Sequence, residues 1–195
     1  LEHARAVARR IRAGNVHLEL TAAYPAGMRV ERLVAEPPSS RTAEPFPVDP
    51  DASAILQFTS GSTARPKVVQ LSHRAVTANL RAILDAVGVR PSDRAVSWLP
   101  LYHDMGLIGL LLCPMVSGID TTFIPTGVFM QKPGLWMRTI SDQRATLTAG
   151  PSFAYGLAAR LLARTRDIDL STLRVALCGA EPVVASTPAE FGDRG

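Results

Sequence analysis

The chain has 195 residues and a net charge of +4, and its 47% hydrophobic and 19% charged residues are typical of a folded globular protein. Its basic residues are scattered and form no stripe between aromatic residues, which argues against nucleic-acid binding. The longest apolar stretch, Met105 to Val116, contains Pro114 and is shorter than the roughly 20 residues that a membrane-spanning helix needs.

The first quarter of the chain has weak structural signals. Residues 2–13 predict a short amphipathic helix, and residues 16–20 and 28–30 are weak strand-like runs. Residues 36–51 are rich in proline, which predicts an extended linker or surface crossing. We therefore divide the chain into an N-terminal segment that matches no clear pattern (1–35), this linker (36–51) and a domain that spans residues 52–195.

From residue 52 onward, apolar runs alternate with helical patterns. Strands are predicted at residues 54–59, 67–71, 94–99, 119–124, 145–149 and 173–178. Helices are predicted at residues 72–87, where Ser72 is suited to the N-cap and Gly88 to the stop, and at residues 105–116, 132–143 and 152–163. This alternation predicts an α/β fold with a mostly parallel sheet flanked by helices. The strands lack strict alternation, as expected when both faces of the sheet are covered.

A run of small and hydroxyl residues, Thr59 to Lys67, follows the first of these strands. Such a loop can bring backbone N–H groups, hydroxyls and one ammonium group close to a polyphosphate. The common P-loop needs a glycine directly before its lysine, and Pro66 stands there instead. Taken alone, this composition is more often that of a solvated turn.

Three further segments follow predicted strands, where open α/β sheets place their ligands. They are residues 97–106, which contain adjacent His103 and Asp104, residues 149–155 and residues 178–183. Adjacent residues rarely hydrogen-bond each other usefully, so Asp104 is not expected to orient His103. An ordinary turn explains any one of these segments taken alone.

Together and in this order, the segments resemble the acyl-adenylating enzymes, which include acyl-CoA synthetases, peptide-synthetase adenylation domains and luciferases. The resemblance spans about residues 53–187 and is closest to the fatty acyl-AMP ligases. It is carried by Thr59–Lys67, Trp98–Ile108 with its His-Asp-Met-Gly, Gly150–Tyr155 and Gly179–Val183. A loop of no special function on an unrelated α/β domain is the competing interpretation.

The resemblance implies a role for each segment in binding ATP and an acyl group. The β- and γ-phosphates of ATP would be held by Thr59, Ser60, Gly61, Ser62, Thr63 and Lys67. The catalytic residues would be His103 and Lys67, with His103 positioning the acyl carboxylate at the α-phosphate rather than acting as a base. The acyl group would lie against His103, Asp104, Gly150, Pro151 and Ser152. Adenine would pack along the backbone of Gly179, Ala180, Glu181 and Pro182.

The implied parent reaction is attack of a fatty carboxylate on the α-phosphate of ATP, which yields acyl-adenylate and pyrophosphate. The acyl group would then pass to the phosphopantetheine of an acyl carrier protein or, in the alternative, to CoA. The apolar stretch 105–116 would wall the acyl tunnel or simply belong to the core. The two cysteines, Cys113 and Cys178, lie in apolar runs and predict buried free thiols in a reducing, cytoplasmic setting.

Several features of the family are not matched in these residues. The family's Tyr-Gly-x-Thr-Glu stretch, whose glutamate holds Mg²⁺, is not found here, and neither is the mobile C-terminal subdomain with its catalytic lysine. No metal ligand is therefore assigned, although Mg²⁺ is implied as a cofactor. We expect a central fragment of a bacterial enzyme that is inactive alone; the alternative is a truncated relative that binds nucleotide, acyl chain or carrier protein without turnover.

The phosphate loop also departs from the family pattern, with Ala64 and Val68 where glycine is usual. If the backbone at Val68 needs a positive φ, this β-branched residue would be strained there. Binding of the phosphates by this loop would then be weakened.

Overall fold

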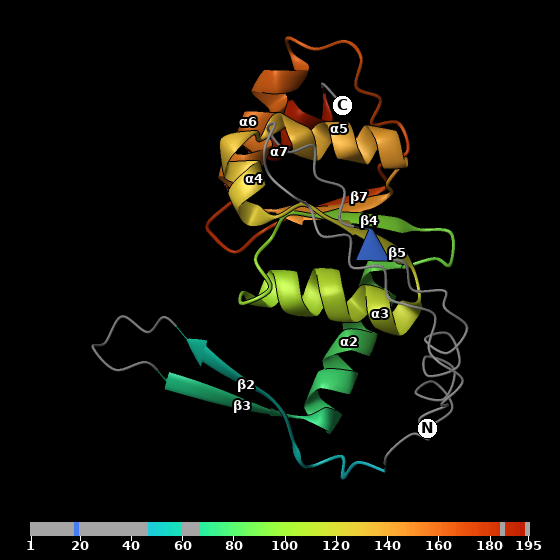
Figure 1. Cartoon of the computed structure of the whole chain (residues 1–195), viewed down its shortest axis with the longest axis vertical. Helices are drawn as coiled ribbons and strands as arrows, with labels where there is room; N and C mark the ends of the chain where they lie inside the picture. The colour runs from blue at the N-terminus through green and yellow to red at the C-terminus, as the bar shows by residue number, and fades with distance from the viewer. Residues whose placement is uncertain (1–17, 20–46, 60–66, 184–185, 194–195) are drawn as a thin grey trace, which may run out of the picture.

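The computed structural model describes residues 18–19, 47–59, 67–183 and 186–193, and these form a parallel sheet between helices with a separate hairpin beside it (Figure 1). The helix predicted at residues 2–13, the run at residues 28–30, most of the linker and residues 60–66 of the phosphate loop lie outside the described residues. The described part therefore tests the elements predicted from residue 52 onward.

Five strands form the main sheet in the order β1-β5-β4-β6-β7, and every neighbouring pair is parallel. The strands are β1 (Leu18–Glu19), β4 (Arg94–Ser97), β5 (Asp120–Phe123), β6 (Leu147–Gly150) and β7 (Val175–Cys178). All four residues of β6 are buried, as expected of a strand covered on both faces. The α/β fold predicted from the sequence is confirmed.

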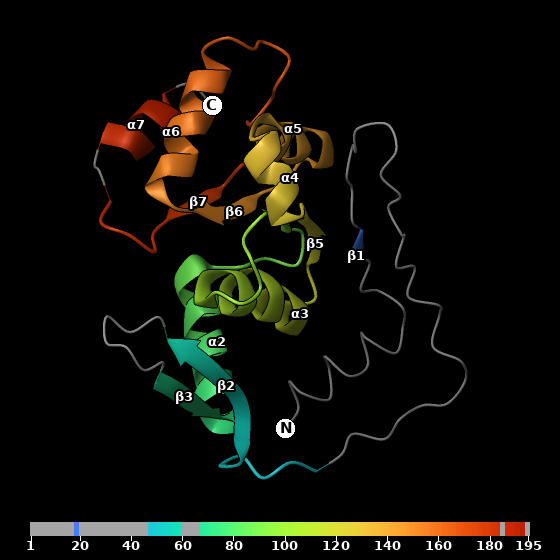
Figure 2. The same cartoon turned by 60° about the vertical axis from the view of Figure 1, so that its left-hand side comes forward.

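Helices cover both faces of this sheet. One face carries α4 (Thr126–Gln131), α5 (Gly134–Gln143), α6 (Ser152–Leu162) and α7 (Ser186–Gly192), as Figures 1 and 2 show. The other face carries the π-helical segment η1 (Met105–Leu112) and its continuation α3 (Cys113–Ser117). Helices α4 and α7 were not predicted, because both are short and neither carries a clear apolar period.

The first two predicted strands form an antiparallel hairpin apart from the parallel sheet. Strands β2 (Ser53–Thr59) and β3 (Lys67–Ser72) pair with each other in a two-stranded sheet of their own. Only residues 60–66 join them, and this connection is shorter than the dozen or more residues that a parallel crossover needs. The two strands therefore could not pair with each other as parallel strands of the main sheet.

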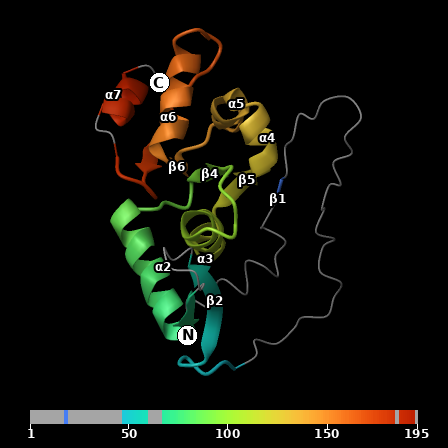
Figure 3. The same cartoon turned by 90° about the vertical axis from the view of Figure 1, so that its left-hand side faces the viewer.

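Helix α2 (His73–Val87) follows the hairpin directly and lies beyond α3, on the far side from α4–α7 (Figure 3). The Ser72 hydroxyl accepts a hydrogen bond from the Ala75 N–H at 3.2 Å, which caps the first turn. Gly88 ends the helix in the left-handed region, with φ of 61°, where glycine carries no Cβ penalty. Both predicted caps are confirmed.

Aromatic rings fill the core between the sheet and α4–α7. Trp98 stacks on Phe129 with ring centroids 3.6 Å apart. Trp136 meets both of these rings nearly edge-on and lies tilted against Tyr155. The Trp136 Nε1–H donates to the Thr148 hydroxyl at 2.9 Å, so this large side chain is buried without losing its hydrogen bond. The cluster ties α4, α5 and α6 to the sheet.

The cysteines differ from each other in their surroundings. Cys113 is buried, and burial raises the pKa of its thiol to about 11. Cys178 is half-buried at the end of β7, so the expectation of two buried thiols is wrong for this residue. The reason is that β7 has a described neighbour only on its β6 side.

Candidate functional site

The chain connections create a topological switch point at the carboxyl ends of β4 and β6. After β4 the chain crosses to β5 over the η1 and α3 face, whereas after β6 it crosses to β7 through α6 on the opposite face. Neighbouring strands whose connections leave in opposite directions mark the point where open α/β sheets bind ligands. We use the name crevice for this position in the sheet, defined by the loop that carries His103 and the turn at Gly150–Ser152.

The loop after β4 holds His103 through its own backbone. The His103 Nδ1 accepts a hydrogen bond from the Met105 N–H at 3.3 Å, and the His103 N–H donates to the Pro100 carbonyl at 3.2 Å. Both His103 and Asp104 are exposed, and within the described residues no hydrogen bond joins them. Met105, rather than Asp104, therefore orients the ring through Nδ1.

Gly106 lets this loop lie close to η1. A Cβ at this position would overlap the Pro100 carbonyl oxygen, which belongs to rigid backbone. Gly106 and Leu110 are buried, whereas the rest of η1 is half-buried. This half-buried, apolar surface beside the crevice is compatible with both predicted roles of residues 105–116.

The turn after β6 packs against the aromatic core. A Cβ on Gly150 would come within 3.1 Å of the Trp136 ring, so a side chain here would require that ring to shift by a few tenths of an ångström. Pro151 precedes α6, and Ser152 is buried with its Oγ 3.4 Å from the Cys178 Sγ. The predicted acyl-binding turn is thus connected to β7.

The predicted adenine-binding turn, residues 179–182, lies beside the turn after β6. The Gly179 N–H donates to the Gly150 carbonyl at 3.2 Å, and a Glu181 carboxylate oxygen accepts from the Phe153 N–H at 3.2 Å. The carboxylate thereby satisfies a free N–H at the positive end of α6. Ala180, Glu181 and Pro182 are exposed.

Ala180 adopts a left-handed backbone conformation, with φ of 69°. A residue with a Cβ pays about 1 kcal/mol or more in this region. The two hydrogen bonds that flank it hold the turn in place, and such strain is often found at ligand sites. The sequence carried no signal for this conformation, because alanine is not a typical left-handed residue.

The predicted phosphate loop is described only at its ends. The Cα atoms of Thr59 and Lys67 are partners across the hairpin, and Ser60, Gly61, Ser62 and Thr63 lie outside the described residues. In the described part of the chain, no hydrogen bond joins the hairpin to the three turns at the crevice. The structure therefore brings Gly150, Pro151 and Ser152 together with the predicted adenine residues. Among the described residues, no hydrogen bond links His103, Asp104 or the phosphate residues to these two turns.

Val68 is not strained. It lies within β3, opposite Phe58, and its φ is not among the positive values in the described chain. A β-branched residue is well suited to a strand, and the positive φ that would have strained it is not present at this position. Its side chain is exposed on the hairpin surface.

A separate cavity of about 260 Å³ lies between β7 and helices α6 and α7. It is lined by Tyr155, Leu170, Leu173, Arg174, Ala176, Cys178, Phe191 and Gly192. Burial raises the pKa of Tyr155, whose hydroxyl donates to the Leu177 carbonyl at 2.9 Å. Among the described residues, no three His, Cys, Asp or Glu side chains form a group suited to a metal ion, and no helix is long and apolar enough to cross a membrane.

Sequence reasoning missed a buried polar cluster at the opposite end of the sheet. Asp93 is 4% exposed and is bonded by Arg174 and Thr146, which lie 81 and 53 residues away along the chain. The only signal in the sequence was the charge of Asp93, directly before the strand predicted at residues 94–99. The partners of Asp93 cannot be recognised without the register of β4, β6 and β7.

The chain is similar in sequence to known proteins. The family model described as AMP-binding enzyme matches residues 4–195. A medium-chain-fatty-acid–[acyl-carrier-protein] ligase of Teredinibacter turnerae is 40% identical over 144 residues, covering 73% of this chain and 22% of the relative. A long-chain-fatty-acid–AMP ligase of Mycolicibacterium smegmatis is 37% identical over 156 residues, covering 75% of this chain and 25% of the relative.

A solved structure shares the fold as well. The fatty acyl-adenylate ligase of L. pneumophila, solved in complex with acyl adenylate and pyrophosphate, superposes with a TM-score of 0.69 at 36% identity. The match covers 78% of this chain and 27% of that protein. The chain thus spans about a quarter of the length of these relatives.

Proposed function

Because the chain belongs to the AMP-binding enzyme family, we propose that it forms part of an enzyme that activates a fatty acid with ATP. A carboxylate oxygen of the acid attacks the α-phosphorus, and the bond from that phosphorus to the oxygen bridging the β-phosphate breaks. The products are acyl-adenylate and pyrophosphate. The observation that carries the proposal is the switch point between β4 and β6, where the turn at Gly150–Ser152 is hydrogen-bonded to the turn at residues 179–182, in a fold shared with an acyl-adenylate ligase.

His103 positions the acyl carboxylate rather than removing a proton. Its Nδ1 already accepts the Met105 N–H, so the neutral ring carries its hydrogen on Nε2. Such a ring has no free nitrogen lone pair, and its Nε2–H donates to an oxygen placed in the crevice. This donor orients the attacking carboxylate toward the α-phosphorus.

The acyl and adenine ends of the product are held by one connected unit. Gly150, Pro151 and Ser152 flank the acyl chain, and the exposed backbone of residues 179–182 packs along adenine. The bond from Gly179 to Gly150 and the bond from Phe153 to Glu181 keep the two turns together. Adenine recognition mainly through backbone suits a turn whose conformation is fixed by such bonds.

The phosphates are held by the hairpin loop, through the hydroxyl and N–H groups of residues 59–63 and the Lys67 ammonium. These donors offset the charge that develops on the leaving pyrophosphate. Mg²⁺, the cation implied for this family, would neutralise phosphate charge when bound. Because the described residues contain no group suited to hold it, no step is assigned to the metal.

We propose phosphopantetheine on an acyl carrier protein as the acyl acceptor, with CoA as the alternative. The acceptor thiol adds to the acyl carbonyl carbon, the thioester forms, and AMP leaves. A relative named as an acyl-carrier-protein ligase supports the first acceptor. Supplying the protein that carries this chain with ATP, Mg²⁺, fatty acid and either acceptor separates the two, by the mass of the acylated product.

The central test is calorimetric titration of the chain with an acyl-sulfamoyl adenosine, a stable mimic of acyl-adenylate. We expect saturable binding that His103→Ala weakens about tenfold, the effect of losing one hydrogen bond to a polar ligand group. His73→Ala, at the first residue of α2, is the matched control and should bind normally. A folded chain that binds no mimic, or equal loss in both variants, would contradict the assignment.

A further inference from the structure

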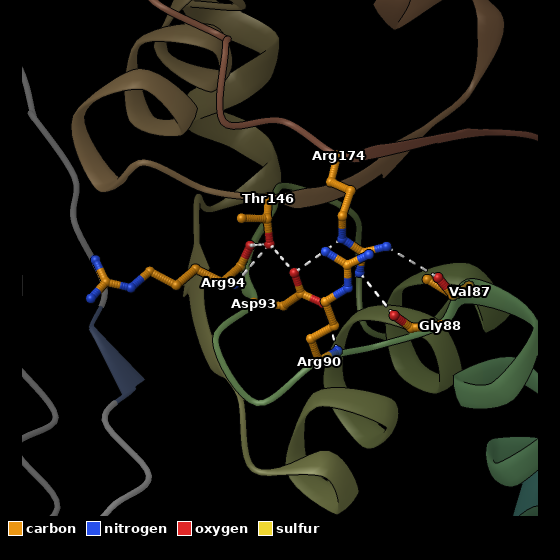
Figure 4. Close-up of polar contacts among 7 residues, drawn as sticks. All are labelled: Val87, Gly88, Arg90, Asp93, Arg94, Thr146 and Arg174. Carbon is orange, nitrogen blue, oxygen red and sulfur yellow. Dashed lines mark hydrogen bonds and ion pairs between the residues drawn. The ribbon is translucent and has the colours of Figure 1, made fainter.

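A buried ion pair joins the amino end of the sheet to the end of α2. The Asp93 carboxylate is 4% exposed and accepts from the Arg174 Nη2 at 2.5 Å and from the Arg174 Nε at 3.3 Å. It also accepts the Arg90 N–H and the Thr146 hydroxyl, each at 2.7 Å. Figure 4 shows these groups converging on the one carboxylate. Every oxygen of this buried charge is therefore satisfied.

Arg174 also binds the last carbonyls of α2. Its Nη2 donates to the Gly88 carbonyl at 3.1 Å, and its Nη1 lies 3.5 Å from the Val87 carbonyl (Figure 4). A guanidinium here complements the negative end of the helix and pairs carbonyls that have no partner within it. Three side chains and two carbonyls thus form a clamp, defined as Asp93, Thr146, Arg174 and the carbonyls of Val87 and Gly88.

Helix α2 is a rigid connection between this clamp and the hairpin. Ser72 is both the last residue of β3 and the N-cap of α2, so no flexible residue separates the two elements. Leu80 is the one fully buried side chain of α2, whose half-buried residues pack against η1 and α3. A helix with so little buried surface depends strongly on the polar contacts at its end.

We infer that Asp93 and Arg174 are positioning residues that set the orientation of the hairpin, and with it of the phosphate loop, through α2. The inference rests on the proposed function, in which residues 59–67 hold the phosphates. In the described residues no hydrogen bond joins the hairpin to the parallel sheet, so α2 is its hydrogen-bonded path to that sheet. The clamp lies at the amino ends of the strands and does not touch the crevice.

The inference is tested by comparing two ligands that differ in their phosphates. An imido analogue of ATP needs the phosphate loop, whereas the acyl-sulfamoyl adenosine has no β- or γ-phosphate. Arg174→Lys keeps the charge but cannot span Asp93 and two helix carbonyls at once. We expect it to weaken binding of the ATP analogue about tenfold, within the range of coupling through a packed element, and to leave binding of the mimic unchanged.

The same substitution on the surface provides the matched control. Arg138 lies on α5 and forms an exposed ion pair with Asp167. Arg138→Lys should change the binding of neither ligand. If Arg174→Lys weakens the binding of both ligands equally, the clamp is merely structural and the inference is overturned. If the unaltered chain binds neither ligand, the proposed function fails.

Hydrogen exchange tests the clamp without any ligand. In Arg174→Lys, amides of β3 and α2 should exchange at least several times faster, while those of β4 and β6 keep their protection. Thr146→Val removes one bond to Asp93 and one from the Arg94 N–H but keeps the ion pair. It should therefore give a smaller change of the same kind in β3 and α2, with the Arg94 amide left out of the comparison. Uniform loss of protection over the whole sheet, or none in β3 and α2, contradicts the inference.

Discussion

The parallel sheet and the hairpin with α2 are held in place in different ways. Around the sheet, Val96, Trp136 and Ile140 are at most 1% exposed, and the rings of the core contact one another directly. In the hairpin and α2, only Leu80 is buried among the side chains described. The first region is stabilised by buried apolar surface, and the second by its caps and the clamp.

This difference suits the chemistry proposed for each region. The crevice needs turns held at fixed spacing, and close packing beneath them provides that rigidity. A phosphate loop must admit ATP and release pyrophosphate, which suits an element with little buried surface. Substitutions in the two regions should therefore differ in the stability that they cost, with the largest loss in the aromatic core.

Replacing Trp136 by alanine should have the largest effect, because it empties the centre of the aromatic core. We expect a loss of about 3–5 kcal/mol in the free energy of unfolding, measured by urea denaturation. Met130→Ala is the control, since that side chain on α4 is 62% exposed. A Trp136→Ala chain within 1 kcal/mol of the parent would contradict a core centred on this ring.

Asp93→Asn should cost about 3 kcal/mol at neutral pH, because it leaves Arg174 without its buried partner. Burial alone would raise the pKa of Asp93, but hydrogen bonds from Arg174, the Arg90 N–H and Thr146 outweigh it and place the pKa below its usual value of 3.8. The carboxylate therefore contributes full stability above about pH 4, and loses it as the pH falls through the lower folded pKa.

Unfolding curves at several pH values check this sign. The difference in stability between the parent chain and Asp93→Asn should be constant from about pH 7 to pH 5 and should shrink below about pH 4. Asp167→Asn, in an exposed pair with Arg138, is the control and should change stability little at any pH. A difference that grows in acid would show that the pKa of Asp93 is raised instead.

Leu80→Ala should cost about 2 kcal/mol, at the low end for a buried leucine, because its exposed surroundings can close over the gap. Leu56→Ala on β2 removes a side chain that is 63% exposed and should cost far less. Hydrogen exchange should place the loss from Leu80→Ala in α2 and the hairpin. Loss of protection that is greatest in β4 and β6 would mean that the two regions unfold as one.

Gly88→Ala should have the smallest effect, about 1 kcal/mol, because only the backbone conformation opposes it. Gly88 has φ of 61° and no atom within 4 Å of an added Cβ. Gly109 in η1 has equal space without the positive φ, so Gly109→Ala should be neutral or slightly stabilising. Thermal melts of both variants compare them, and equal destabilisation would show that φ at Gly88 is not the cause.

Local signals in the sequence were enough for most single elements. The apolar runs located β2 to β7 within a few residues, and the caps Ser72 and Gly88 marked both ends of α2. These features depend on neighbouring residues, so they can be recognised from the chain alone. Short α4 and α7 lack such signals, because tertiary packing rather than periodicity stabilises them.

The candidate site was predicted as separate motifs rather than as an arrangement. Gly150 ends a strand, and His103 and Gly179 each follow one, and this placed them at one edge of a parallel sheet. The role of Met105 in orienting His103, the left-handed Ala180 and the cap from Glu181 to α6 were not foreseen. They depend on how the turns fold back on one another.

The sequence by itself determined the fold class and the resemblance to the acyl-adenylating enzymes, because both rest on the order and chemistry of local segments. The tertiary structure decided that β2 and β3 form a separate hairpin and that the crevice opens between β4 and β6. It also paired Asp93 with Arg174 across 81 residues. Strand order, register and burial arise from contacts between distant segments, and a linear pattern carries no record of them.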